Sequence, residues 1–330
     1  MNSLSYVIFL IITFFPTCSI MWLLLPSLPI SLSGGCFTIN LLCNAIVSDN
    51  SSNKTRSTRF SILQFVESLG IGSGYLIGVL LFNSFGYWVV FATTIMVHTF
   101  ALVYTAARLQ WDFNIRDSEK ESIVQTLRKS MKSVTGSQNK FKILLLVISM
   151  CICQLVKGVD TSTAYLYTRH QFGWGPEDYS YFVMLLVLSG SLGTILVLPV
   201  LSLLLEVDDC VLGIMGTLSW VDFHLVMGLA QGEWLLYLST AFAVLKDCTN
   251  VTIRSILSKL SANNSSSLFS LLACMEALVP LVAAPLSDWV YTVTLSVFPG
   301  SVFMLTAGVL SGNIIVFSII FCLEDLVSQN

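Results

Sequence analysis

The chain has 330 residues, of which 55% are hydrophobic and 11% are charged, and its formal net charge is −3. Soluble globular proteins carry roughly 25% charged residues, so this composition excludes a soluble protein and predicts a membrane protein that crosses the bilayer several times. The 16 Lys and Arg residues are scattered over loops rather than gathered in one stripe, so nucleic acid is not an implied partner.

Ten apolar segments recur along the chain, and most are long enough to cross a hydrocarbon core of ~30 Å as helices. They cover residues 5–28, 32–48, 60–82, 86–107, 142–168, 180–205, 210–230, 233–258, 267–290 and 300–323. We therefore expect an all-α polytopic membrane protein with about ten transmembrane helices.

A long polar break at residues 108–141 divides these segments into four and six. It predicts three parts: a partial N-terminal four-helix bundle (1–107), a cytoplasmic linker (108–141) and a C-terminal six-helix bundle (142–330). Within the linker Ile123, Leu127, Met131 and Val134 recur at helical spacing and predict an amphipathic helix. This helix is either a solvated linker or a regulatory, partner-binding segment.

The orientation in the bilayer follows from the cations, because Lys and Arg accumulate in cytoplasmic loops. Most of them lie in the loop at 49–59, in the polar break and near Arg254 and Lys259. We expect both termini in the cytoplasm. The glycosylation sequons at Asn50, Asn53, Asn263 and Asn264 then face the cytoplasm and stay unmodified.

The segment at 60–82 carries an acid and a row of glycines. Glu67 lies within about 80° of Gly70, Gly74 and Gly78 on a helical wheel. An ionisable group inside a spanning helix costs at least ~2.5 kcal/mol, so Glu67 is expected to line a cavity or to pair with another charge. The glycines predict close approach of a neighbouring helix.

A first polar stripe lies in the segment at 142–168, where Gln154, Lys157 and Asp160 share one face. Lys157 and Asp160 are spaced so that they can pair. Such a pair either only neutralises two buried charges or forms part of a substrate or proton site.

A second stripe lies in the segment at 233–258, where Asp247, Asn250 and Arg254 share one face. Three polar residues on one face of an apolar span predict a cavity wall. Lys246 points about 100° away from Asp247, and we expect it to serve another wall or to pair elsewhere.

Signatures of enzymes and cofactors are missing from the sequence. There is no GxSxG, no HExxH and no P-loop motif, so we expect neither enzymatic activity nor a cofactor. The nine cysteines lie in or beside apolar runs without paired CxxC spacing, which favours packing roles over metal or redox roles.

Two helix groups separated by a basic loop suggest the major facilitator architecture, in which two bundles rock around a central site. Specific stretches resemble the proton-coupled folate transporter family, solute carrier family 46, over nearly the whole chain. They are SDNSSNKTRSTR (48–59), GYWVVF (86–91), YLYTRHQFGW (165–174), IRSILSKL (253–260) and LFSLLACMEAL with the later FPG. The chain would correspond to helices three to twelve of that family.

The resemblance implies roles for individual residues. Asp49 matches an acid at the cytoplasmic end of the family's helix four, and Arg254 matches an arginine of helix ten associated with substrate and proton handling. The family's proton-coupling glutamate falls on Gln64, which cannot exchange a proton, when counted without a gap from Arg59. We hypothesise that Glu67, one helical turn later, takes over this role.

The resemblance also implies that the family's first two helices have no counterpart before Met1, so the chain is expected to be truncated at its N-terminus. The leading interpretation is a proton-coupled symporter for a small organic solute, anionic and folate-like, working by alternating access. Arg254 would attract the anion, Lys157 would balance the acids, and Glu67, Asp160 or Asp247 would exchange protons. The alternative is a truncated, non-transporting membrane paralogue that binds a ligand or partner. The sequence leaves the plasma membrane and the lysosomal membrane open as locations.

Overall fold

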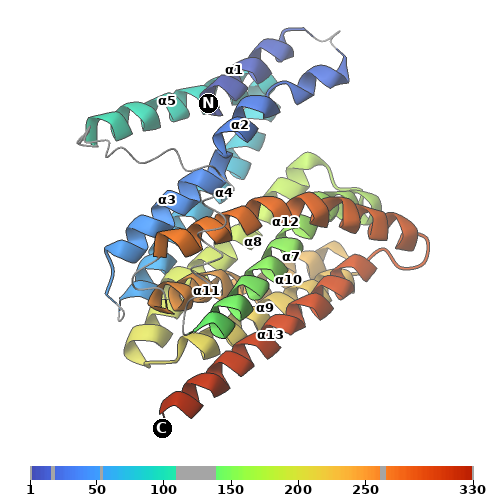
Figure 1. The fold of residues 1–330 in the computed structure, drawn as a ribbon. Helices are drawn as coiled ribbons and strands as arrows, with labels where there is room; N and C mark the ends of the chain where they lie inside the picture. The colour runs from blue at the N-terminus through green and yellow to red at the C-terminus, as the bar shows by residue number, and fades with distance from the viewer. Residues whose placement is uncertain (1, 16–18, 53–54, 109–138, 261–264, 329–330) are drawn as a thin grey trace. The chain divides into compact units, whose positions relative to one another are not determined.

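The computed structural model describes residues 2–15, 19–52, 55–108, 139–260 and 265–328. Every regular element among these residues is helical (Figure 1), so the predicted all-α class is confirmed. The amphipathic helix predicted at 108–141 lies outside the described residues.

The helices follow the chain in two groups on either side of the predicted linker. The first group comprises α1 (Asn2–Thr13), the 3₁₀ helix η1 (Ile20–Leu24), α2 (Ser27–Ser33), α3 (Gly35–Asp49), α4 (Arg56–Phe85) and α5 (Tyr87–Arg108). The second comprises α7 (Lys140–Phe172), α8 (Pro176–Leu192), the π-helical segments η2 (Gly193–Val197) and η3 (Val200–Leu204), α9 (Asp209–Gly228), α10 (Glu233–Phe242), the 3₁₀ turn η4 (Ala243–Leu245), α11 (Lys246–Leu260), α12 (Ser265–Thr294) and α13 (Ser301–Ser328).

Eight helical segments in the described part of the chain are long and apolar enough to cross a membrane. Two of the ten predicted spans differ from the structure. The segment at 5–28 is not one helix, because α1 ends at Thr13 and η1 begins at Ile20. The segment at 233–258 is divided by the 3₁₀ turn η4, and α11 carries charged residues at both ends and in its interior.

The chain divides into two compact units: residues 1–40 with 76–126, and residues 41–75 with 127–330. In the first unit α1 packs along α5 through a stacked pair of rings, Phe9 and Phe91, whose centroids lie 5.2 Å apart. Tyr6 and His98 extend this contact, with their rings 5.0 Å apart. The predicted division at the linker differs from these units and stays a prediction.

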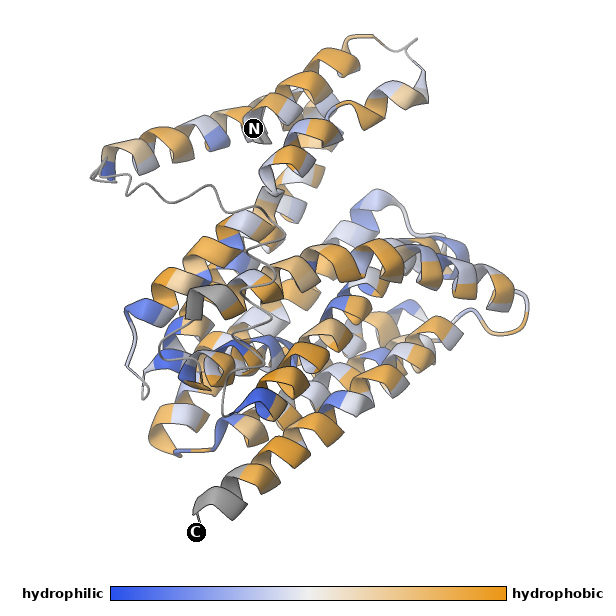
Figure 2. Ribbon diagram, viewed as in Figure 1, coloured by the Kyte–Doolittle hydropathy of each residue, from blue (hydrophilic) through white to orange (hydrophobic). Residues whose placement is uncertain are grey.

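The second unit has a well-packed interior. Helix α7 packs against α12 and α13, and α9 packs against α11 and α13. Leu146, Met150, Phe303 and Phe317 are fully buried at these contacts. Outward-facing side chains are also apolar, and Figure 2 shows hydrophobic residues along most of α12 and α13. A water-soluble protein would not present such surfaces, whereas a bilayer solvates them.

One end of the second unit is held by a hydrogen-bonded cluster centred on Asp209. Its carboxylate accepts hydrogen bonds from Ser57 at 3.0 Å, from Ser255 at 3.0 Å and from Lys259 at 2.6 Å. The Ser57 and Ser255 hydroxyls are also 2.7 Å apart. Helices α4, α9 and α11 are therefore tied together at this end.

The predicted glycine contact is not found where the sequence placed it. A Cβ atom built on Gly70 or Gly74 meets no atom of the described residues within 4 Å. Tight helix approach occurs instead at Gly193, where a Cβ atom would lie 1.8 Å from the Val244 carbonyl oxygen. Glycine spacing identifies where a helix permits close contact, and the tertiary structure decides where the partner lies.

Candidate functional site

A cavity of about 250 Å³ lies within the second unit. Side chains from α4, α7, α8, α9 and α11 form its wall. Five of the lining residues are ionisable acids or amines: Glu67, Lys157, Asp160, Lys246 and Asp247. Since charges inside membrane helices are costly when they face lipid, a shared internal cavity accounts for their presence in these spans.

Glu67 and Gln64 place α4 at this wall. Both side chains line the cavity, with Gln64 8% exposed and Glu67 half-buried. The structure therefore agrees with the expectation that Glu67 faces a cavity. Its role in proton exchange stays a prediction.

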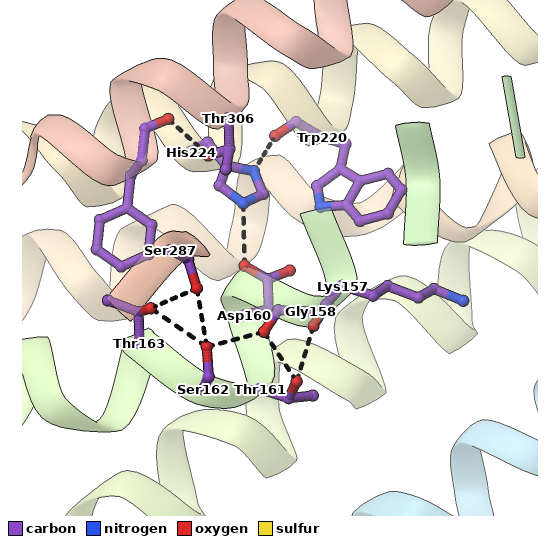
Figure 3. Close-up of polar contacts among 11 residues, drawn as sticks. Lys157, Gly158, Asp160, Thr161, Ser162, Thr163, Trp220, His224, Ser287 and Thr306 are labelled. Atoms are coloured by element: carbon purple, nitrogen blue, oxygen red, sulfur yellow. Dashed lines mark hydrogen bonds and ion pairs between the residues drawn. The ribbon is translucent and has the colours of Figure 1, made fainter. Parts of the chain in front are cut away.

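The stripe on α7 divides into one buried residue and two half-buried residues that line the cavity. Lys157 and Asp160 line the cavity, and Gln154 is buried beside Met150. Among the described residues Lys157 forms no ion pair with Asp160, so the predicted pairing is wrong. Figure 3 shows the Lys157 side chain extending away from the Asp160 carboxylate.

Asp160 pairs instead with His224 of α9. The distance from Asp160 Oδ1 to His224 Nε2 is 3.0 Å, and His224 Nδ1 lies 2.9 Å from the Trp220 carbonyl oxygen. The Asp160 side chain is 25% exposed, whereas the His224 side chain is fully buried. Figure 3 shows this chain of contacts from Trp220 through the imidazole to the carboxylate.

The next turn of α7 is fixed to α12 by hydroxyl groups. The Thr163 hydroxyl donates to Asp288 Oδ1 at 2.9 Å and lies 3.0 Å from the Ser287 hydroxyl, and the Ser162 and Ser287 hydroxyls are 3.0 Å apart. These contacts, visible in Figure 3 for Ser162, Thr163 and Ser287, hold the helix turn that carries Asp160.

The stripe on α11 also divides. Asp247 lines the cavity and accepts a hydrogen bond from Lys246 Nζ at 3.1 Å. The expectation that Lys246 pairs away from Asp247 is therefore wrong, because its flexible side chain reaches back to the neighbouring carboxylate. Asn250 is 1% exposed, does not line the cavity, and neither atom of its amide has a hydrogen-bond partner among the described residues.

Arg254 does not line the cavity itself but contacts Gln64, which does. Its Nη2 donates to Glu276 Oε1 at 2.8 Å, and its Nη1 donates to Gln64 Oε1 at 3.4 Å. Both charged side chains are buried. In this conformation the guanidinium is occupied by protein partners, and it supports the Gln64 wall. Asp49 is exposed at the C-terminal end of α3 and is not part of the cavity lining.

Aromatic residues form much of the remaining wall, and sequence reasoning did not select them. They are Tyr75, Tyr179, Phe182 and Phe223. His224 also lies outside the two polar stripes predicted from the sequence, because its partner Asp160 is 64 residues away along the chain. The sequence signal that could have identified His224 is its position within an apolar span, where an ionisable residue is a candidate functional residue.

The described residues contain no group of three or more His, Cys, Asp or Glu side chains placed to hold a metal ion. The cavity wall carries amines, carboxylates and aromatic rings, and an imidazole lies behind it in contact with Asp160. Such a set can bind an organic ion and exchange protons.

Comparisons with known proteins place this cavity in a known architecture. Residues 3–207, more than half of the chain, match the sequence profile of the Major Facilitator Superfamily. The chain is 24% identical over 300 residues to the probable peptidoglycan muropeptide transporter SLC46 of Drosophila melanogaster, which covers 84% of this chain. It is 22% identical over 277 residues, or 77% of its length, to the lysosomal proton-coupled steroid conjugate and bile acid symporter SLC46A3 of Gallus gallus.

The chain spans about half the length of these curated relatives, 56% of each. A solved structure, that of the human organic anion transporter MFSD10 (TETRAN), superposes with a TM-score of 0.75 at 14% identity. The match covers 96% of this chain and 74% of the solved one. It establishes a shared fold, and the solute carrier 46 resemblance seen in the sequence is confirmed by the two relatives.

Proposed function

Because the chain belongs to the Major Facilitator Superfamily, we propose that it is a secondary active transporter that moves a small organic anion with protons by alternating access. The observation that carries this proposal is the cavity of about 250 Å³, which collects five ionisable side chains from membrane-spanning and adjoining helices. Facilitator proteins bind their solutes in central cavities of this kind.

Lys157 is the side chain to which we assign the anion. It lines the cavity, and among the described residues it forms no ion pair. Arg254, predicted for this role, is held by Glu276 and Gln64. Lys246 also lines the cavity, but Asp247 neutralises it. Among the described residues that line the cavity, the Lys157 ammonium group is thus the one available for a carboxylate, sulfate or sulfonate.

The aromatic wall favours a substrate with a large apolar portion. Tyr179 and Phe182 stand on α8 beside the cavity, and Phe223 stands on α9. Ring faces and edges pack against apolar ring systems while an amine binds the acidic group. Steroid conjugates and bile acids, named for the chicken relative, have this division, and muropeptides, named for the fly relative, carry carboxylates.

The test is uptake into proteoliposomes that contain the purified chain. Radiolabelled estrone sulfate, taurocholate and a muropeptide are supplied separately at an acidic outer pH, with and without a proton gradient. We expect at least one to accumulate, with accumulation lost when a protonophore collapses the gradient. Uptake that is the same with and without the proton gradient would contradict proton symport.

A matched pair of variants tests the anion contact. Lys157→Gln should raise the KM of the transported anion at least about tenfold, because a charge-assisted hydrogen bond contributes about 1.5–3 kcal/mol, whereas Lys157→Arg should retain most of the affinity. Binding of the same probes by the wild type without flux would favour the alternative, a membrane protein that binds a ligand and does not transport it.

We also propose the lysosomal or the plasma membrane as the location, since an acidic compartment supplies protons for symport and the chicken relative is named as lysosomal. Imaging of the tagged chain beside lysosomal and surface markers tests this. Signal confined to another membrane would contradict it.

A further inference from the structure

The contact between Asp160 and His224 requires a particular protonation state of the two side chains. His224 Nδ1 lies 2.9 Å from the Trp220 carbonyl oxygen. A carbonyl oxygen only accepts hydrogen bonds, so Nδ1 must carry a hydrogen to make this bond. In a neutral imidazole the other nitrogen is then a bare acceptor.

That other nitrogen, Nε2, lies 3.0 Å from Asp160 Oδ1. A bare imidazole nitrogen and an ionised carboxylate are both acceptors, and two acceptors do not form a hydrogen bond. The observed distance therefore requires one more proton between them. Either the imidazole is a cation facing a carboxylate, or a neutral imidazole faces a carboxylic acid.

We propose that Asp160 and His224 together hold one exchangeable proton and form the proton-coupling site of this transporter. The inference rests on the proposed transport function for its biological role. It competes directly with the hypothesis that Glu67 exchanges the proton in place of Gln64, whose amide has no proton to exchange.

The exposure of the two side chains suits this role. Asp160 lines the cavity and is 25% exposed, whereas His224 has no exposed surface. A proton from cavity water reaches the Asp160 carboxylate first and is then shared with Nε2. Protonation takes the pair from a net charge of −1 to zero, and release to water returns the proton by the same carboxylate.

The surroundings of the pair carry charges of both signs. Titratable and charged groups face it from α4 (Glu67), α7 (Lys157), α8 (Tyr179), α11 (Lys246 and Asp247) and α12 (Asp288, through Thr163). From α13 the neighbouring ring is that of Phe303, 6.2 Å from the imidazole. Since Lys246 is paired with Asp247, Lys157 is the cation on the cavity wall that forms no ion pair among the described residues.

This arrangement links the proton to the substrate. An anion bound at Lys157 adds a negative charge to the wall that carries Asp160, and like charges at short range disfavour each other. The protonated, neutral pair therefore admits the anion more readily than the deprotonated pair does. Anion and proton then bind together, as symport requires.

The experiment separates coupling from transport. Proteoliposomes carrying wild type, Asp160→Asn, Glu67→Gln or the control Asp222→Asn are compared in two assays with radiolabelled estrone sulfate or whichever probe of the panel the wild type accumulates. Asp222 lies on the same helix as His224 but is exposed and outside the cavity lining. One assay measures accumulation driven by a proton gradient, and the other measures counterflow, an exchange that needs no net proton movement.

We expect Asp160→Asn to lose accumulation at least tenfold while keeping counterflow, and Asp222→Asn to keep both. Accumulation by Asp160→Asn equal to wild type overturns the inference, and so does loss of accumulation in Glu67→Gln alone. If the wild-type protein shows no counterflow, the result contradicts the proposed transport function rather than the shared proton. The next measurement tests the shared proton without requiring transport.

A second measurement decides the matter where Asp160→Asn loses both activities or where no probe is transported. The ¹⁵N spectrum of the purified protein labelled at its three histidines is recorded at neutral pH, and His224→Gln identifies the signals. We expect Nδ1 of His224 to carry a proton and its Nε2 signal to move in Asp160→Asn. A bare Nδ1, or an Nε2 signal unchanged by Asp160→Asn, overturns the shared proton.

Discussion

The buried pair of Arg254 and Glu276 allows a quantitative test of the interior of the second unit. Nη2 and Oε1 are 2.8 Å apart, and the two side chains are 7% and 5% exposed. At this separation and an effective dielectric constant of ~20, the attraction is ~6 kcal/mol. The cost of removing both charges from water offsets most of it, so the pair as a whole contributes little to stability.

Removing one partner has a different effect from removing both. Arg254→Met leaves the Glu276 carboxylate buried without its cation, and Glu276→Leu leaves the guanidinium without its anion. Each single variant should lose ~3–5 kcal/mol, whereas the double variant should be more stable than either. The additional contact of Arg254 with Gln64 is long, at 3.4 Å, so it contributes less than the ~1.5–3 kcal/mol of a well-formed hydrogen bond to a charged group.

The assay is thermal unfolding of the four purified proteins in one detergent, followed by tryptophan fluorescence. At ~2 °C per kcal/mol the single variants should melt at least ~6 °C below wild type, and the double variant should recover at least half of that loss. Losses that simply add in the double variant would refute the reasoning, because they would show that neither charge depends on the other.

Two further predictions concern packing and the cluster at Asp209. Gly193→Ala should lower the unfolding midpoint by several degrees, because its Cβ atom would lie 1.8 Å from the Val244 carbonyl oxygen and overpacking costs ~1–3 kcal/mol. The matched control is Gly74→Ala, whose Cβ atom meets no described atom within 4 Å. This control should melt at or above the wild-type midpoint. Asp209→Ala removes an acceptor shared by α4 and α11, so hydrogen exchange of the amides around Ser255 should accelerate at least tenfold, and unchanged exchange would show that the cluster does not hold this end.

The sequence by itself determined the class of the protein and most of the ionisable residues that line its cavity. Apolar runs of membrane-spanning length could only be helices in a bilayer, because backbone groups must be satisfied within the segment. Ionisable residues inside those runs had to face one another or water, and Glu67, Lys157, Asp160 and Asp247 do line one cavity. Both conclusions follow from transfer energies, which depend on residue type and local spacing alone.

The sequence predicted the ends of the helices less accurately than their presence. The run at 5–28 is apolar throughout, yet α1 ends at Thr13. The run at 233–258 reads as one span, yet the 3₁₀ turn η4 divides it. Hydrophobicity reports solvent preference and carries little information on where a helix changes its hydrogen-bonding pattern.

Only the tertiary structure decided which charges meet. Spacing on one helix suggested that Lys157 pairs with Asp160, but His224 of α9 takes that carboxylate at 3.0 Å. Arg254 similarly finds Glu276 of α12 rather than a free anion. A helical wheel fixes the directions of side chains on one helix, whereas an ion pair depends on the relative rotation and depth of two helices, and the packing of the whole bundle sets these.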